Sequence, residues 1–224
     1  MNTVPVGRAP VDPGARLALL FGGTFDPPHR AHIELPAEVR DLLEADTLVY
    51  IPAARSPHKA DGPVASAEDR ITMLRAALDG RPRVAISTIE LQRSATEPSY
   101  TADTLRALRE ELPATTALRL LIGADQAAAF HLWRHPELIA ALAEPVVMLR
   151  TPLESADALL ARMQPHWPAA DLDRWRARIV PIPVLDAEAT DIRRRLADNP
   201  DDPALAGLIP APVLAYIRAR RLYR

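Results

Sequence analysis

Short apolar runs recur along the chain and alternate with longer amphipathic segments. A continuous apolar run bounded by turn residues predicts a strand that is buried on both faces, and amphipathic segments predict helices. The alternation predicts an α/β fold, an open, doubly wound parallel sheet. The strands are expected at Leu17 to Phe21, Thr47 to Ile51, Val84 to Ile89, Leu118 to Ile122, Val146 to Leu149 and Ile179 to Val184.

The helices are expected between these runs. Thr101 is a reasonable N-cap for one that continues through Leu108. The last apolar run is interrupted by prolines, so we expect it at an edge of the sheet. Further helices are expected after the first strand with Pro36 inside, at Arg70 to Leu78, around Trp133, and at Ser155 to Met163.

The first 15 residues carry prolines and glycines without periodicity, which predicts a flexible lead-in before a single domain over 16–224. In doubly wound sheets, ligands bind outside the carboxyl ends of the strands where the strand order reverses. Gly22 and Asp125 follow the first and fourth predicted strands. We therefore expect them to face one cleft.

The stretch FGGTFDPPHRAHIEL follows the first strand directly. Gly22 and Gly23 let a polyphosphate approach the main chain, and the helix that follows offers unpaired N–H groups to an anion. His29 and His32 lie one turn apart, so both imidazoles can face one ligand. An ordinary loop with a surface histidine pair remains the alternative. A metal site is not expected, because no third ligand lies nearby.

The composition excludes several classes of partner and of chemistry. A formal net charge of -2 gives no global basic field, which argues against nucleic acid. The absence of cysteine excludes disulfides, thiolate metal sites and a cysteine nucleophile. No apolar run is long enough to cross a membrane, and the first 16 residues lack the apolar core of a signal peptide. A cytoplasmic protein is expected.

The segment GGTFDPPHRAH resembles the GGTFDPxHxGH signature of nucleotidyltransferases that adenylylate small phosphorylated metabolites, with Ala31 in place of the usual glycine. Thr190 to Arg193 resembles the end of a second signature, SSTxIR, with Glu188 and Ala189 replacing its serines. Thr190 is also a plausible helix N-cap, and the adjacent Arg194 and Arg195 are expected to be solvated. The resemblance implies a Rossmann-like fold and an ATP site at Gly22, Gly23, Thr24, Phe25, His29, His32, Thr190 and Arg193.

Three middle segments resemble the nicotinate mononucleotide adenylyltransferase branch: SPHK with Lys59, EPSYTADTL, and GADQ followed by Leu132-Trp133. The resemblance implies that Trp133 stacks on the pyridine ring and that Tyr100 and Thr101 bind its carboxylate. It also implies that Asp125 contacts the nucleotide sugar region and that Lys59 helps to hold phosphate. Without the resemblance, each would be an ordinary core, cap or surface residue.

The implied reaction is adenylyl transfer from ATP to nicotinate mononucleotide, with no protein nucleophile. His29, His32 and Arg193 are the expected catalytic residues, and Mg²⁺ is expected to arrive with ATP. A homo-oligomer is compatible with the sequence. Pantetheine-phosphate adenylyltransferase shares the first signature and is the alternative enzyme. A nucleotide-binding regulator without turnover is the alternative from another class, because Ala31, Glu188 and Ala189 depart from the signatures.

Overall fold

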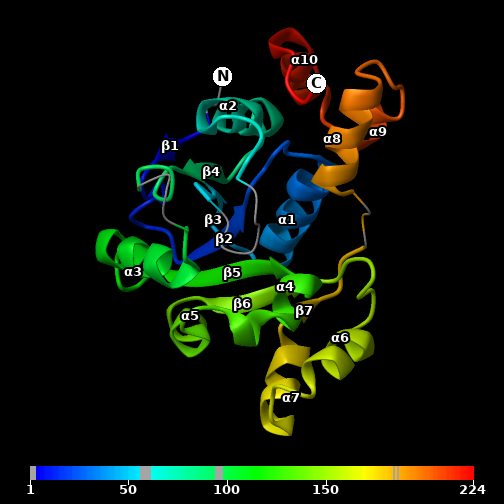
Figure 1. The fold of residues 1–224 in the computed structure, drawn as a ribbon. Coiled ribbons are helices and arrows are strands. Elements are labelled where there is room, and N and C mark those ends of the chain that lie inside the picture. The colour runs from blue at the N-terminus through cyan, green and yellow to red at the C-terminus, as the bar shows by residue number, and fades with distance from the viewer. Residues whose placement is uncertain (1–3, 56–61, 94–97, 184, 186) are drawn as a thin grey trace.

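The computed structural model describes residues 4–55, 62–93, 98–183, 185 and 187–224 (Figure 1). Among these residues, seven strands form one parallel sheet in the order β1-β4-β3-β2-β5-β6-β7. The predicted α/β, doubly wound open parallel sheet is confirmed. The strands are β1 (Val6–Gly7), β2 (Leu17–Gly23), β3 (Thr47–Pro52), β4 (Val84–Ser87), β5 (Ala117–Gly123), β6 (Glu144–Met148) and β7 (Ile179–Val180).

Helices cover both faces of this sheet (Figure 1). In β2, Leu19 and Phe21 point into one core while Ala18 and Leu20 point into the other. Burial on both faces explains why this strand is a continuous apolar run. One face packs α1 (Arg30–Leu42), α2 (Ala67–Leu78), α8 (Ala189–Asp198), α9 (Leu205–Leu208) and α10 (Ala211–Arg220). The other packs α3 (Thr101–Glu111), α4 (Ala124–Ala128), the 3₁₀ turn η1 (Phe130–Leu132), α5 (Pro136–Leu142), α6 (Ala156–Met163) and α7 (Ala169–Ala177).

The strand order reverses at the centre of the sheet. β2 pairs with β3 on one side and with β5 on the other, and Phe21 is in register with both Tyr50 and Leu121. From β2 the chain moves outward to β3 and β4, then returns to β5 and continues to β6 and β7. This reversal is the topological switch point at which open α/β sheets bind ligands.

Several local predictions need correction. Val6–Gly7 pairs in parallel with β4, so this part of the expected lead-in belongs to the sheet. The last strand lies at an edge as predicted, but it ends at Val180, before Pro181 and Pro183. Position 184 lies outside the described residues. Proline cannot donate to a strand ladder, which explains the short strand.

Two helix starts also differ from the prediction. Tyr100, not Thr101, is the N-cap of α3, so Thr101 is its first helical residue. Glu188, not Thr190, is the N-cap of α8. Neither cap residue makes a side-chain capping hydrogen bond. Neither helix start is therefore stabilised by a polar cap side chain.

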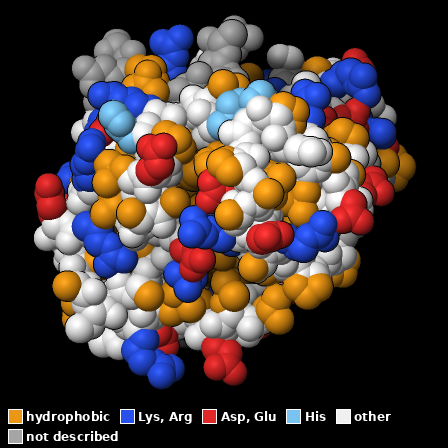
Figure 2. Space-filling view, turned by 90° about the horizontal axis from the view of Figure 1, so that it is seen from below, with side chains coloured by type: hydrophobic (Ala, Val, Ile, Leu, Met, Phe, Trp, Pro, Cys, Tyr) orange, Lys and Arg blue, Asp and Glu red, His pale blue; other side chains and the backbone are white. Residues whose placement is uncertain are grey.

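The distribution of charged side chains on the surface is consistent with the small net charge. On the face shown in Figure 2, basic and acidic side chains are interspersed, without a continuous area of one sign. In the part of the chain that the structure describes, every helix is too short or too polar to span a bilayer.

Candidate active site

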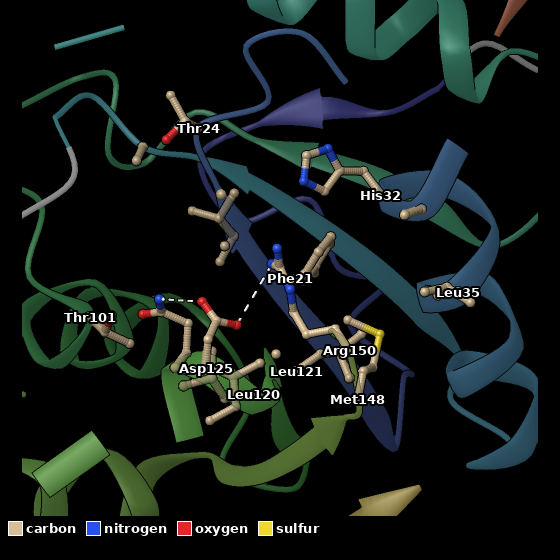
Figure 3. A pocket seen from close by; sticks show the side chains of 18 of the residues that line it. Phe21, Thr24, His32, Leu35, Thr101, Leu120, Leu121, Asp125, Met148 and Arg150 are labelled. Atoms are coloured by element: carbon tan, nitrogen blue, oxygen red, sulfur yellow. Dashed lines mark hydrogen bonds and ion pairs between the residues drawn. The ribbon is translucent and has the colours of Figure 1, made fainter. Parts of the chain in front are cut away.

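A cavity of about 350 Å³ opens at the carboxyl ends of β2 and β5 (Figure 3). The predicted neighbours Gly22 and Asp125 both line it, so the single expected cleft is confirmed. In Figure 3, Asp125 and Arg150 point toward one another, and His32 projects from the other side of the cavity. The other predicted site residues on its wall are Gly23, Thr24, His29, His32, Thr101 and Trp133.

The two histidines form a stacked pair at the start of α1. His29 is the N-cap with extended backbone, and its ring lies 3.6 Å from the ring of His32, centroid to centroid. His29 is 3% exposed. Burial, and secondarily the charge of Arg150, lowers the pKa of His29 to about 3. At neutral pH it is therefore a neutral imidazole, which binds an anion by donating one hydrogen bond rather than by charge.

The glycines allow close approach of the loop to its neighbours. A Cβ at Gly23 would lie 3.0 Å from the ring of Phe25, and one at Gly123 would lie 2.7 Å from the Asp125 carboxylate. Phe25 was expected in the ATP site, but it is 1% exposed and its side chain is not on the cavity wall. Its ring instead packs edge-on against His32, with centroids 5.2 Å apart.

The second signature contacts the first through Arg193. The Arg193 guanidinium donates to the Asp26 carbonyl at 2.8 Å and to the Thr190 hydroxyl at 3.3 Å. Neither Arg193 nor Thr190 is on the cavity wall. Arg193 holds the loop that forms the wall, and Thr190 is a second acceptor for its guanidinium. Arg194 and Arg195 both pair with Asp191, in agreement with the expected surface role.

Asp26 joins four segments of the chain. Its carboxylate accepts hydrogen bonds from the amides of Val64 and Ala65 at 2.7 and 3.1 Å, and from the Tyr223 hydroxyl at 2.7 Å. Its carbonyl accepts the bond from Arg193. The signature loop is thereby tied to the approach to α2, to α8 and to the end of the chain.

The predicted acceptor residues lie on the α3 and α4 side of the cavity. Thr101 opens α3, and Trp133 follows η1 and packs on Phe130 with ring centroids 5.2 Å apart. Tyr100 is not on the wall; its ring lies under the guanidinium of Arg134 at 4.8 Å. Lys59 lies outside the described residues.

Sequence reasoning missed two charged residues of the wall, Arg150 and Glu90. Arg150 lies 3.7 Å from both the Asp125 and the Glu188 carboxylates, and it is the only arginine or lysine among the described lining residues. Glu90 is buried and accepts a hydrogen bond from Thr104 at 2.8 Å. Both directly follow a predicted strand, and this position could have identified them.

Comparisons with known proteins cover most of the chain. A family model described as cytidylyltransferase-like matches residues 20–195. A protein of Chromobacterium violaceum named probable nicotinate-nucleotide adenylyltransferase is 39% identical over 213 residues, which cover 92% of this chain and 97% of the relative. A Bordetella petrii protein of the same name is 40% identical over 210 residues, which cover 92% and 97%. The chain belongs to the nicotinate-nucleotide adenylyltransferase family.

The fold of the chain is similar to that of a solved structure. The nicotinic acid mononucleotide adenylyltransferase of Plasmodium falciparum, complexed with NaAD, is 18% identical with a TM-score of 0.71, covering 93% of this chain and 97% of that one. The resemblance seen in the two signatures is therefore confirmed at the level of family and fold. Both relatives are named nicotinate-nucleotide adenylyltransferases, and each alignment covers 97% of the relative. These matches favour the nicotinate branch over the pantetheine-phosphate alternative.

Proposed function

We propose that this protein transfers the adenylyl group of ATP to nicotinate mononucleotide, giving nicotinate adenine dinucleotide and pyrophosphate in NAD biosynthesis. The observation that carries the proposal is that residues predicted for ATP and residues predicted for the acceptor line one cavity. The histidine pair and Arg150 line the same cavity as Thr101 and Trp133. The names of the relatives support the choice of acceptor.

The reaction needs alignment and charge stabilisation rather than a protein nucleophile. A 5′-phosphate oxygen of the acceptor attacks the α-phosphorus of ATP, and the bond from the α-phosphorus to the bridging oxygen breaks as pyrophosphate leaves. Holding the two anions in line lowers the barrier, and donors aimed at the phosphate oxygens stabilise the spread negative charge. We assign the donor role to His29 and His32.

The permanent positive charge comes from arginines. His29 is neutral at pH 7, so it cannot offset the charge of a triphosphate. Arg150 lines the cavity, and we propose that it exchanges its carboxylate partners for a substrate phosphate. Arg193 holds the signature loop through Asp26. The contact of Arg193 and Thr190 with the β- and γ-phosphates stays a prediction, because neither residue is on the cavity wall.

The acceptor would occupy the side of the cavity near α3. Trp133 would stack on the pyridine ring, and N–H groups at the start of α3, beside Thr101, would bind the carboxylate. Asp125 would contact the sugar region. Tyr100 and Lys59 stay predictions for the carboxylate and the phosphate, because Tyr100 is off the wall and Lys59 lies outside the described residues.

We treat Mg²⁺ as part of the ATP substrate. Among the described residues, no cluster of three or more His, Asp or Glu side chains is placed to hold a metal ion. An ion bound to the triphosphate would reduce repulsion between the two anions. We also place the protein in the cytoplasm and regard a homo-oligomer as compatible with it.

Pyrophosphate release tests the proposal. The purified protein is incubated with ATP and Mg²⁺ and with nicotinate mononucleotide, nicotinamide mononucleotide or phosphopantetheine as acceptor. Strong preference for nicotinate mononucleotide is expected. Turnover with phosphopantetheine alone would assign the other branch, and ATP binding without turnover on any acceptor would favour the regulator.

A further inference from the structure

Pro36 removes one main-chain hydrogen bond from α1, in the turn that carries His32. In an α-helix the N–H of residue i donates to the carbonyl of residue i−4, and proline has no N–H. The carbonyl that loses its donor is therefore that of His32. Helix α1 nevertheless runs without interruption from Arg30 to Leu42.

A side chain from the sheet replaces the missing donor. The hydroxyl of Tyr50, on β3, donates to the main-chain carbonyl of His32 at 3.1 Å. Tyr50 is 0% exposed, and burial raises the pKa of its hydroxyl, which keeps the proton in place for donation. A main-chain carbonyl that loses its helix donor is stabilised by another donor, so this contact supports the first turns of the helix.

The same tyrosine also supports the ring of His32. The Tyr50 ring packs edge-on against Phe21 and Phe25, with centroids 5.9 and 5.7 Å apart. Phe25 in turn packs edge-on against the His32 ring. The His32 amide is held separately, by donation to the His29 carbonyl at 2.9 Å. Thus Tyr50 supports His32 through the main chain and, via Phe25, through the ring.

We propose that Tyr50 is a positioning residue for His32, and that its hydroxyl takes the place of the helix hydrogen bond that Pro36 removes. The proposal rests on the proposed role of His32 as a phosphate donor. Tyr50 itself does not line the cavity. It acts by fixing the first turn of α1, on which the orientation of the imidazole depends.

The test is a double-mutant cycle of Tyr50→Phe and Pro36→Ala. Phenylalanine keeps the ring packing and removes only the hydroxyl, so kcat should fall about tenfold, with KM changed less than about twofold. Pro36→Ala should leave kcat near that of the wild type. In the double variant, the N–H of residue 36 can donate to the His32 carbonyl, and most of the lost kcat should return.

A spectroscopic readout makes the test independent of turnover. The ring C–H signal of His32 in a ¹H–¹³C NMR spectrum, assigned with a His32→Asn variant, should move in Tyr50→Phe and return in the double variant. Tyr216→Phe is the control, because it removes a tyrosine hydroxyl that donates to the Asp69 carboxylate at 2.8 Å, away from the cavity wall.

Three outcomes would overturn the positioning role of Tyr50, and a fourth would overturn the proposed function alone. Wild-type kcat in Tyr50→Phe, or failure of Pro36→Ala to restore it, would overturn the positioning role. A lower melting temperature with unchanged kcat and an unmoved His32 signal would do the same. If the wild type turns over no acceptor while the His32 signal follows the predicted pattern, the proposed function fails and the positioning role stands.

Discussion

Glu90 should make the stability of this protein depend on pH near neutrality. The side chain is 7% exposed in the cavity wall, and its carboxylate accepts a hydrogen bond from the Thr104 hydroxyl. Burial raises the pKa of Glu90 to about 7, although hydrogen bonds from Thr104 and Ser99 and the charges of Arg93 and Arg70 act in the opposite direction. The perturbation is Glu90→Gln, which keeps the shape and removes the charge.

The raised pKa of Glu90 determines the direction and the size of its effect on the stability of the fold. A carboxyl group with a raised pKa stabilises the folded state fully below its ordinary pKa and loses that contribution as the pH rises through the folded value. The difference between 4.5 and about 7 corresponds to on the order of 3 kcal/mol, at 1.36 kcal/mol for each pH unit. For a chain of this size that is roughly 6–12 °C in melting temperature.

Thermal and urea unfolding between pH 4.5 and pH 8.5 would measure the effect. The two proteins should have similar stability at pH 4.5, Glu90→Gln should become progressively more stable than the wild type between pH 4.5 and about 7, and the difference should stay constant above that. Glu38→Gln, at an exposed position of α1, is the matched control and should follow the wild type. Parallel stability curves for the wild type and Glu90→Gln would refute the argument.

Four further predictions concern the residues around the cavity. Tyr223→Phe removes a hydrogen bond to the buried Asp26 carboxylate, so the free energy of unfolding in urea should fall by about 1.5–3 kcal/mol; an unchanged value would mean that the bond does not contribute. His32→Ala should lower kcat by orders of magnitude while the circular dichroism spectrum stays that of the wild type; near-native turnover would remove His32 from the mechanism. Trp133→Ala should chiefly raise KM for the mononucleotide. An unchanged KM would mean that Trp133 contributes to packing and not to substrate binding. Because the pKa of His29 is lowered from 6.5 to about 3 by burial, stability should decline as the pH falls below 6.5, less so in His29→Asn.

The local pattern of apolar and turn residues was sufficient to predict the main strands and the centre of the site. The run Leu17 to Phe21 is buried on both faces, so its residues are apolar throughout and the strand is visible without tertiary information. The rule that ligands bind where strand order reverses then placed Gly22 and Asp125 on one cavity wall. The roles assigned to the individual site residues stay predictions.

The elements that the sequence did not predict depend on partners distant in the chain. Strand β1 is only two residues long and exists because β4 offers it an edge to pair with. Phe25 belongs to the segment predicted to bind phosphate, but its packing against His32 makes it a core residue. Short apolar segments have no periodicity of their own, so only the surrounding fold decides where they lie.

The sequence by itself determined the order of the strands from β2 to β7, the loop predicted to bind an anion, and the family, because periodicity, turn residues and signatures are encoded over a few neighbouring positions. Only the tertiary structure brought Arg150 to the histidine pair and raised the pKa of Glu90. It alone gave the His32 carbonyl a donor from Tyr50 in place of Pro36. Charge interactions and burial depend on distances through space, and the sheet sets those distances between residues that are far apart along the chain.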